Sequence, residues 1–400
     1  MKIAFFVHSF PEISETFILR QVTGLLDRGH ELRIFAYNAA PNGPVHDAVN
    51  AYQLRRLVRI LPRHTDGGVS ARARIAALAV LRPADARALG GWRSLVRTVA
   101  AFSAEGPFDV VHCHYGDIGL HYRVAARVLR SPLVVSFYGY DCSSYPRAHG
   151  QRVFEPLFAA ADAVTSLSTH MDARLRELGS PADLLRRIPL AADPATFRPV
   201  ERPSRDAGPV RILTIARLTE KKGIEFALRA IALVVEEFPG LRYDIVGDGP
   251  LHDELEHIAE SLGVRANVTF YGSRTDDSVR AALSGADLFM LPSITAADGD
   301  QEGTPTAVIE AAFSALPVLS TWHAGIPELV RDGETGYLVP ERDYEALANR
   351  LRTLLRSPEQ RWSMGAAGRR HVEREHTTGA VAERLEQLYL ELVERTTSQA

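Results

Sequence analysis

The sequence predicts an α/β protein of two doubly wound, parallel-sheet domains that face each other across a cleft. Short apolar runs alternate with amphipathic helical segments along the whole chain. The 400 residues are too many for one ordinary domain and suit two of similar size. A proline-rich stretch without periodicity near the middle is typical of a linker. The expected divisions are a first domain over residues 1–190, a linker over 191–209, a second domain over 210–375, and a C-terminal helix over 376–400 that crosses back to the first domain.

The first half opens as a strand, a helix and a strand. Ser14 can cap a helix that runs through Phe17 and Leu26, and Gly29 ends that helix. The opening lacks the glycine fingerprint GxGxxG, so a dinucleotide site of that kind is not expected. The apolar runs predicted as strands lie at residues 2–8, 31–37, 108–113, 133–137 and 163–167.

The second half repeats this alternation. A strand over residues 210–216 leads into a loop with two adjacent lysines and then into an amphipathic helix over 224–237. Further strands are expected at residues 241–246, 268–271, 287–291, 317–321 and 333–340. Further helices are expected at residues 252–262, 305–312 and 379–393, with another beginning near 325.

Composition excludes several classes of protein. The net charge of −3 gives no reason to expect a nucleic-acid partner, and no apolar run reaches the roughly 20 residues that span a bilayer. The first residues enter a strand directly and do not resemble a signal peptide, so we expect a cytoplasmic protein. Cys113 and Cys142 have neither metal-ligand nor disulfide-framework spacing and are expected as reduced thiols. Only three residues are lysines, and Lys221 and Lys222 are adjacent, which indicates a specific role for the pair.

Residues 51–99 carry ten arginines and two aspartates, a formal charge of +8 in a chain whose net charge is −3. Leu54, Leu57, Val58 and Leu61 recur at helical spacing among these arginines, which predicts a basic amphipathic helix. Two interpretations stay open. The helix could pack on the core with a solvated arginine face, or it could contact an anionic membrane surface or a lipid-pyrophosphate acceptor.

Glu302 and Glu310 lie on either side of an expected helix start, between two apolar runs that complete a βαβ unit. Thr304 is a good N-cap and Pro305 suits the first helical position. The free N–H groups and the dipole of such a helix favour an anion between the two carboxylates. A nucleotide sugar fits, because its diphosphate can lie on the helix start while the carboxylates accept hydrogen bonds from hydroxyls. Surface charge that only complements the dipole is the alternative.

Several predicted strands of the first half end in polar or aromatic residues. Because the carboxyl ends of parallel strands meet at one edge of a sheet, we expect these residues to line the acceptor side of a cleft. A single histidine is more often structural than functional, so the histidines are candidates only. The acceptor-side candidates are Ser14, Glu15, His114, Tyr138, Asp141 and His170, together with His112 as a structural or functional histidine.

Five motifs follow one another in the second half. They are ARLTEKKG at residues 216–223, VGDGPL at 246–251, the Glu302–Glu310 stretch, AGIPELV at 324–330 and DGETGYLV at 332–339. In this order they resemble the retaining nucleotide-sugar glycosyltransferases of family 4, whose GT-B fold has two Rossmann-like domains, the first for the acceptor and the second for the donor. In the first half, SFPEISETFI at residues 9–18 and FYGYD at 137–141 are similar to a branch that acts in bacterial exopolysaccharide and colanic-acid-type assembly.

The resemblance implies roles for these residues. Arg217 and Lys222 would contact the donor diphosphate and offset the charge on the leaving group without a metal. Glu310 would accept hydrogen bonds from the ribose hydroxyls. The implied set is Glu302, Arg217 and Lys222 as catalytic residues, and Glu310, Gly303, Thr304, Pro305, Gly247 and Gly249 as donor-binding residues.

The chain departs from the family pattern in a few places. Tyr138 stands where the family often has a histidine, and Leu190-Ala191 replaces a commoner Asn-Gly. Ala315 replaces a usual glycine after the helix of Glu310. The sequence Asp298-Gly299-Asp300 spells the metal-binding motif of a different transferase fold, and no metal is expected here.

The resemblance thus implies a cytoplasmic, metal-independent, retaining transferase without a cofactor. Its donor would be a UDP- or GDP-hexose, its acceptor a glycan or lipid-linked saccharide, and its setting exopolysaccharide or cell-surface glycan synthesis, with peripheral contact at the inner membrane face as an option. The alternatives are a nucleotide-sugar 2-epimerase, a phosphorylase, and a non-catalytic sugar-nucleotide-binding subunit of an assembly complex.

Overall fold

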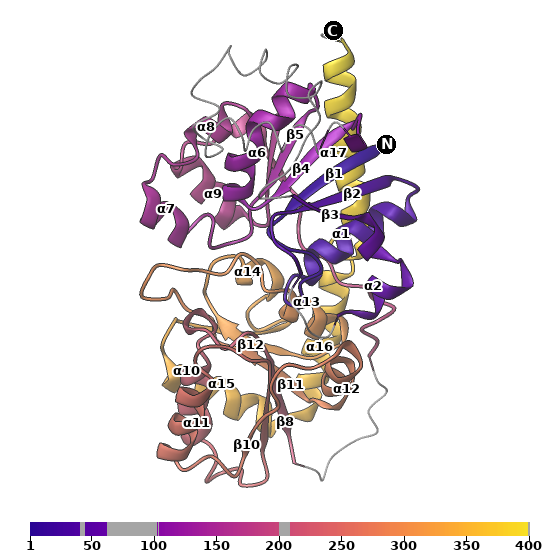
Figure 1. Cartoon of the computed structure of the whole chain (residues 1–400). Coiled ribbons are helices and arrows are strands. Elements are labelled where there is room, and N and C mark those ends of the chain that lie inside the picture. The colour runs from indigo at the N-terminus through magenta and orange to yellow at the C-terminus, as the bar shows by residue number, and fades with distance from the viewer. Residues whose placement is uncertain (41–44, 62–101, 103, 200–208, 399–400) are drawn as a thin grey trace. The chain divides into compact units, whose positions relative to one another are not determined.

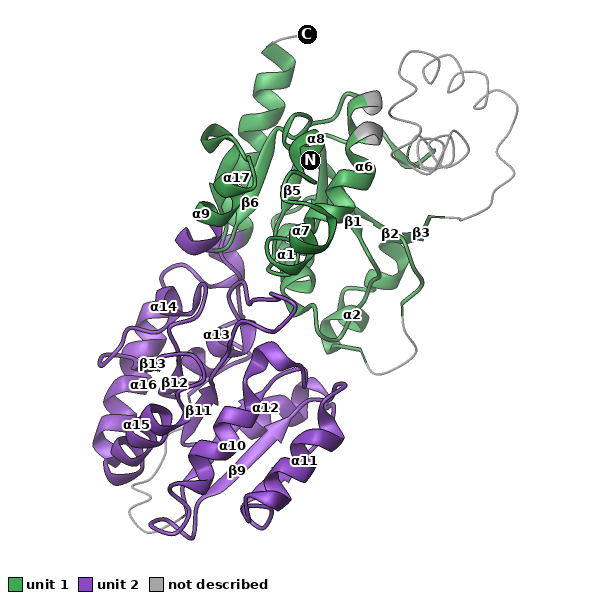
Figure 2. Ribbon diagram, turned by 90° about the vertical axis from the view of Figure 1, so that its left-hand side faces the viewer, with its two compact units in different colours: residues 1–167, 172–188, 382–400 green, residues 168–171, 189–381 purple. Residues whose placement is uncertain are grey.

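The computed structural model describes residues 1–40, 45–61, 102, 104–199 and 209–398 (Figure 1). The chain forms two compact units. The first contains residues 1–167, 172–188 and 382–400, and the second contains residues 168–171 and 189–381 (Figure 2). Each unit has its own sheet, and the strands of both sheets pair in parallel. Among the described residues, no helix is both long enough and apolar enough to cross a bilayer.

The sheet of the first unit has the strand order β3-β2-β1-β4-β5-β6-β7. Its central strands are buried almost throughout, as expected for a parallel sheet covered on both faces. The order reverses between β1 and β4, and ligands of such sheets bind beyond the carboxyl ends of the strands at that switch point. The strands are β1 (Lys2–Val7), β2 (Glu31–Ala36), β3 (Val58–Ile60), β4 (Val110–His114), β5 (Leu133–Ser136), β6 (Ala163–Ser166) and β7 (Leu185–Arg187).

The last helix of the chain belongs to both units. Helix α17 begins in the second unit, and its residues 382–398 lie in the first. There the hydroxyl of Tyr389 lies 2.6 Å from Nδ1 of His112 in β4, and Arg186 reaches Glu391. The remaining helices of the first sheet are α1 (Thr16–Asp27), α2 (Asp47–Ala51), α6 (Gly116–Leu129), α7 (Ser144–His149), α8 (Glu155–Phe158) and α9 (Thr169–Glu177), and α17 spans Thr378–Ser398.

The sheet of the second unit has the order β10-β9-β8-β11-β12-β13, so its switch point lies between β8 and β11. Strand β8 lies at the centre of this sheet. The chain next adds β9 and β10 on one side of β8, and then β11, β12 and β13 on the other side. The strands are β8 (Arg211–Ile215), β9 (Arg242–Val246), β10 (Val268–Phe270), β11 (Leu288–Leu291), β12 (Val318–Thr321) and β13 (Gly336–Val339).

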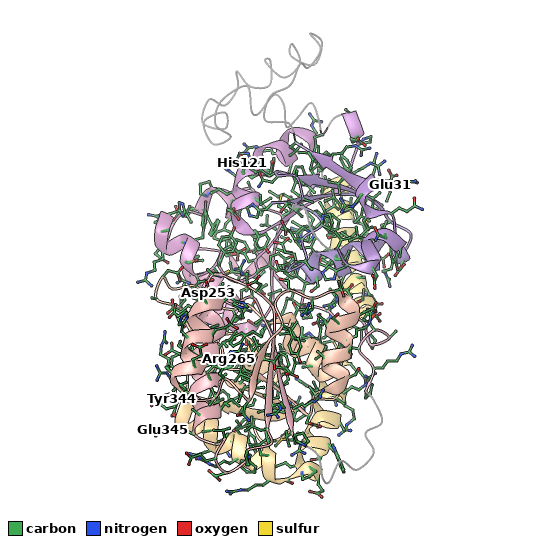
Figure 3. The ribbon with its side chains drawn as sticks, turned by 60° about the horizontal axis from the view of Figure 1, so that its bottom comes forward. Glu31, His121, Asp253, Arg265, Tyr344 and Glu345 are labelled. Carbon is green, nitrogen blue, oxygen red and sulfur yellow. The ribbon has the colours of Figure 1, made fainter. Side chains whose placement is uncertain are left out.

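Apolar side chains of α10, α11 and α15 form one core against the second sheet, and α13 packs beside α16. Figure 3 shows the side chains that fill the space between the sheet and these helices, while Glu345 at the start of α15 lies at the surface. The helices are α10 (Ile224–Ala232), α11 (His252–Ser261), α12 (Asp276–Gly285), α13 (Thr306–Phe313), α14 (Ile326–Leu329), α15 (Tyr344–Arg356) and α16 (Pro358–Val372).

The prediction of a basic amphipathic helix from Leu54 onward is wrong for the residues that the structure describes. Leu54–Leu57 is one turn of 3₁₀ helix, and Val58–Ile60 is edge strand β3, paired with β2. The β-branched Val58 and Ile60 favour a strand, and Arg59 is held by Glu105, with Nε 2.5 Å from Oε1. Residues 62–99 of the basic segment lie outside the described residues.

Candidate active site

The candidate site of the second unit is built on the loops that follow β8 and β11, on either side of the switch point. The two loops approach so closely that Gly223 is required between them. A Cβ at Gly223 would lie 1.9 Å from the carbonyl oxygen of Pro292, and the residue has φ +64°, which favours glycine. The N–H of Ile294 donates to the carbonyl of Lys221 at 2.8 Å. The lysine loop is therefore fixed directly against the loop that carries Glu302.

This contact joins Lys222 and Glu302 in an ion pair. Nζ of Lys222 lies 2.5 Å from Oε1 of Glu302, which also accepts from the Ser293 hydroxyl at 3.3 Å. Burial by itself would raise the pKa of Glu302, but the charges of Lys222 and Lys221 outweigh it and hold the pKa below its ordinary value. Lys221 points to a different partner, because its Nζ lies 2.9 Å from Asp300. Asp300 of the Asp-Gly-Asp sequence is thus the counter-ion of a lysine.

Arg217 lies on the same loop after β8, and its side chain is exposed. Among the described residues its guanidinium has no hydrogen-bond or ion-pair partner. The backbone on either side of it is fixed by the loop after β9. A Cβ at Gly247 would lie 1.8 Å from the Ala216 carbonyl oxygen, and one at Gly249 would lie 2.5 Å from that of Leu218. These two glycines therefore support the loop that presents Arg217.

Helix α13 begins one residue later than the sequence predicted. Its N-cap is Pro305, so the prediction that Thr304 caps it is wrong. The hydroxyl oxygen of Thr304 is instead buried and, within the described parts of the chain, has no hydrogen-bond partner. The backbone N–H groups of Thr306 and Ala307 likewise have no acceptor among the described residues. These donors give the start of the helix the character of an anion site.

The backbone at the helix start is supported from behind by the loop after β12. The N–H of Gly325 donates to the carbonyl of Gly303 at 3.1 Å. A side chain at Gly325 would meet Thr304 at 2.6 Å, so the motif residue Gly325 is required by close packing. Glu310 lies within α13 and is buried. The structure thus brings Lys222 and Glu302 into contact and gathers the donor-side residues on adjoining loops of one sheet edge.

In the first unit, Asp141 organises the loop after β5. Its carboxylate accepts backbone N–H groups from Gly116 at 3.0 Å, Tyr138 at 2.9 Å and Gly139 at 2.8 Å. Burial raises the pKa of Asp141 to about 6, although the three N–H groups act in the opposite direction. Asp141 therefore ties the carboxyl ends of β4 and β5 together.

His114 and Tyr138 pack in a buried aromatic cluster. Nδ1 of His114 lies 2.7 Å from the Tyr138 hydroxyl, while the other ring nitrogen has no partner among the described residues. Burial and the neighbouring His112 hold the pKa of His114 well below its ordinary value, and burial lowers that of His112 to about 3. Both rings are neutral at physiological pH. His112 bridges Ser136 and Tyr389, which is a structural arrangement.

The remaining acceptor-side candidates are Glu15, Ser14 and His170. Glu15 occupies the N-cap position of α1 and accepts the Tyr115 hydroxyl at 2.7 Å. Ser14 is exposed and is not the cap of that helix, so this cap prediction is wrong. His170 is exposed at the start of α9 and groups with the second unit. Glu15, His114, Tyr138 and Asp141 therefore gather in the first unit, and Ser14 and His170 are exposed.

Sequence reasoning did not select a second polar group at the first switch point. Nε2 of His8 lies 3.1 Å from Asp117 and 3.2 Å from the Tyr140 hydroxyl, and that hydroxyl donates to Asp117 at 2.6 Å. Burial alone would lower the pKa of His8, but the hydrogen bond and the charge of Asp117 raise it by more. The pKa of His8 therefore lies above its ordinary value. His8 follows β1 directly, and the rule that selected His114 applies equally to it. Also missed were His323 and Glu341 of the second unit, which are described below.

The two parallel sheets and the charged loops at the second switch point define a two-domain α/β protein with a candidate site for an anion. A family model for glycosyl transferases group 1 matches residues 200–371, and one for the glycosyl transferase 4-like domain matches residues 14–191. The chain belongs to the family 4 glycosyltransferases, with the GT-B fold.

Two relatives cover most of the chain. WcaL of Escherichia coli K12, described as a colanic acid biosynthesis glycosyltransferase, is 35% identical over 88% of this chain and 90% of its own. AmsK of Erwinia amylovora, an amylovoran biosynthesis glycosyltransferase, is 32% identical over 94% of this chain and 96% of its own. A GDP-mannose-dependent mannosyltransferase of Mycolicibacterium smegmatis is 31% identical over 52% of this chain and 57% of its own.

Solved structures share the fold at lower identity. HepE of Anabaena in complex with UDP and glucose superposes with a TM-score of 0.76 at 19% identity, covering 98% of this chain and all of HepE. Sucrose-phosphate synthase of Thermosynechococcus elongatus gives a TM-score of 0.75 at 21% identity over 99% of this chain and 100% of its own. At these identities the likeness is one of fold alone.

Proposed function

We propose that this glycosyltransferase moves a hexose from a nucleoside-diphosphate sugar to a glycan or lipid-linked saccharide, with retention of anomeric configuration and without a metal ion. In this proposal Arg217 and Lys222 face the diphosphate, Glu302 holds the donor sugar and Glu310 accepts hydrogen bonds from the ribose. The names of WcaL and AmsK support a role in exopolysaccharide synthesis.

The observation that carries the proposal is the ion pair of Lys222 and Glu302 beside the open start of α13. A departing diphosphate gains negative charge, which an ammonium, a guanidinium and free N–H groups stabilise. The carboxylate next to the ammonium suits a neutral group that donates hydrogen bonds, such as a sugar hydroxyl. An anion and a polyol could therefore bind side by side. The departing phosphate oxygen would take the proton of the acceptor hydroxyl on the same face, which gives retention.

One relative and one structural neighbour support the proposal of a UDP or GDP donor. HepE was solved with UDP and glucose, and the mycobacterial relative is GDP-mannose-dependent. Thermal unfolding with UDP, GDP, ADP and their sugar conjugates tests the donor class. A nucleotide at 100 times its dissociation constant should stabilise the protein by about 2.7 kcal/mol. If none of them shifts the unfolding temperature, the proposal is wrong.

Product analysis tests the reaction type. Transfer should persist with EDTA present, and NMR of the product should show the anomeric configuration of the donor. A mixture without any acceptor should yield only slow hydrolysis, whereas a 2-epimerase would convert the donor sugar completely to equilibrium. The acceptor class stays a prediction, as does contact of residues 51–99 with an anionic membrane surface. Equal liposome binding after neutralisation of Arg55, Arg56 and Arg59 would contradict that contact.

A further inference from the structure

A buried histidine lies behind Glu302. His323 is in the loop after β12, and its side chain is 1% exposed. Its Nε2 lies 3.1 Å from the backbone nitrogen of Glu302, and its Nδ1 lies 2.6 Å from Oε1 of Glu341. The imidazole therefore connects the peptide of a proposed catalytic residue with a carboxylate that follows β13.

These contacts define the protonation of the ring. A backbone N–H can only donate, so Nε2 of His323 must accept the bond from Glu302 and carries no proton. Nδ1 must then carry the proton and donate it to Glu341. A proton added at Nε2 would face the Glu302 N–H and break that bond. The arrangement requires the neutral Nδ1–H tautomer.

Glu341 is itself held in place. It accepts the backbone N–H of Thr295 at 2.8 Å, and Arg342 lies 3.4 Å away. Burial raises the pKa of Glu341, but the bonds from Thr295 and His323 outweigh this and lower it, so the group is a carboxylate at neutral pH. Thr295 belongs to the same loop as Glu302. A series of hydrogen bonds thus runs from Thr295 through Glu341 and His323 to Glu302, and it connects two points of that loop.

The bond to Glu302 has a direct geometric consequence. The carboxylate of Glu302 is held by Lys222 and Ser293, and the carbonyl side of its peptide, at Gln301, lies 3.3 Å from Nζ of Lys221. His323 holds the other side of this peptide as the acceptor of its N–H, and the carbonyl of Gly303 is held in turn by the N–H of Gly325. A buried N–H without an acceptor is also costly, so the peptide would reorient if the acceptor were removed.

We propose that His323 and Glu341 are positioning residues that fix the backbone of Glu302, and with it the direction of the carboxylate toward the donor sugar. This inference rests on the proposed function for its catalytic consequence. Its structural part, the fixed peptide, can be tested without any substrate.

The first experiment measures hydrogen exchange of the peptide segment that contains Glu302, by mass spectrometry on the full chain. His323→Phe keeps the volume of the ring and removes the acceptor, so exchange of the segment should accelerate by about tenfold or more. His323→Gln places an amide oxygen near the Nε2 position and should restore slow exchange. His257→Gln, on an exposed histidine of α11, is the matched control and should change nothing. Equal exchange in all four proteins would overturn the proposal.

The second experiment separates positioning from binding. With UDP-glucose and GDP-mannose as donors, His323→Phe should lower kcat by about 10- to 100-fold, because a misplaced group loses orientation. The dissociation constant of UDP or GDP by calorimetry should change by less than about threefold, and His323→Gln should regain most of the rate. A rate and an affinity that fall together, or a glutamine variant as slow as the phenylalanine one, would contradict a positioning role.

A variant at a partly exposed position covers the case in which His323→Phe does not fold. Glu341→Leu removes the partner that holds the ring and should accelerate exchange at Glu302, whereas Glu341→Gln keeps one acceptor and should have a smaller effect. Unchanged exchange in Glu341→Leu would also refute the proposal. If the wild type turns over no nucleotide sugar, the proposed function fails, and the exchange measurement still decides whether His323 fixes the peptide.

Discussion

The two switch points of this chain have the same geometry and opposite chemistry. In the second unit the loops beyond β8 and β11 carry an exposed guanidinium, a lysine paired with a buried carboxylate, and the free N–H groups of α13. In the first unit, strand β4 and the loops beyond β1, β4 and β5 carry packed aromatic rings, buried neutral histidines and Asp141, whose carboxylate accepts three backbone N–H groups. The fold supplies both positions, and the side chains divide the chemistry between them.

The difference teaches what each unit is suited to bind. Cations next to open N–H groups stabilise a diphosphate, whereas aromatic rings next to hydroxyl and carboxylate groups suit a neutral polyol. Under the proposed function, the second unit would thus bind the anionic donor and the first unit the uncharged acceptor. Each variant below changes one side of this comparison.

The largest effect is expected at the cations of the second unit. Arg217→Ala and Lys222→Ala should each cost about 3–4 kcal/mol of transition-state stabilisation, or about 10²–10³ in rate, if each faces developing charge. Steady-state turnover measures this. Arg265→Ala removes an exposed arginine that pairs with Glu256 and should leave the rate unchanged. Near-normal turnover in both site variants would contradict the assignment.

The next effect concerns Glu310. Glu310→Ala should weaken UDP or GDP binding by about 1.5–3 kcal/mol, the value of a charged hydrogen bond that is lost. Calorimetry gives the affinity directly. The control is Glu345→Ala, at the surface position labelled in Figure 3. Equal affinities in the wild type and Glu310→Ala would exclude the ribose contact.

Substitution of Glu302 should change UDP binding and sugar transfer in opposite directions. Its carboxylate neutralises Lys222, so Glu302→Gln leaves more positive charge for a diphosphate, and UDP should bind more tightly by about 1 kcal/mol while transfer falls. Asp300→Asn releases Lys221 instead and serves as the comparison. Weaker UDP binding in Glu302→Gln would show that the carboxylate itself contacts the nucleotide.

A smaller effect is expected at the ion pair of the first unit. The raised pKa of His8 means that its stabilisation is complete below the ordinary pKa of 6.5 and is lost as pH rises through the folded value. Asp117 has a lowered pKa, so the pair is also lost as pH falls through that value. Because both side chains are partly exposed, the pair should contribute less than about 1 kcal/mol. NMR titration of His8 should show a lower pKa in Asp117→Asn, and an unchanged pKa would exclude the pair.

The smallest effect is expected at Ala315, which follows α13 with φ 55°. The N–H of Leu316 donates to the carbonyl of Ala311 at 3.0 Å, so Ala315 holds the left-handed position of a helix end that favours glycine. Ala315→Gly should stabilise the second unit by a few tenths to about 1 kcal/mol in chemical denaturation. A loss of stability would mean that the methyl group makes compensating contacts.

The sequence predicted the central strands well, because strands buried on both faces appear as unbroken apolar runs. It missed β3 and β7, whose three residues each include arginine at a sheet edge. The caps expected at Ser14 and Thr304 are wrong because each helix begins one residue later, a shift that residue preferences do not resolve.

The candidate sites could likewise be predicted from the sequence only in part. The family motifs placed Lys222 and Glu302 in one catalytic set, but their ion pair is visible only in the structure. His323 could not be selected, since only the sheet order brings its partner Glu341 near, whereas His8 follows β1 directly and met the criterion that selected His114. The roles proposed for Arg217, Glu310 and the acceptor-side residues stay predictions.

The position of helix α17 has a consequence for biosynthesis. Leu385, Leu388 and Tyr389 are buried parts of the first unit, and Tyr389 is the partner of His112 in a central strand. The ribosome makes these residues only after the whole second unit. The first unit therefore cannot complete its core as it emerges, and must wait for the second to be synthesised before its own apolar face is covered.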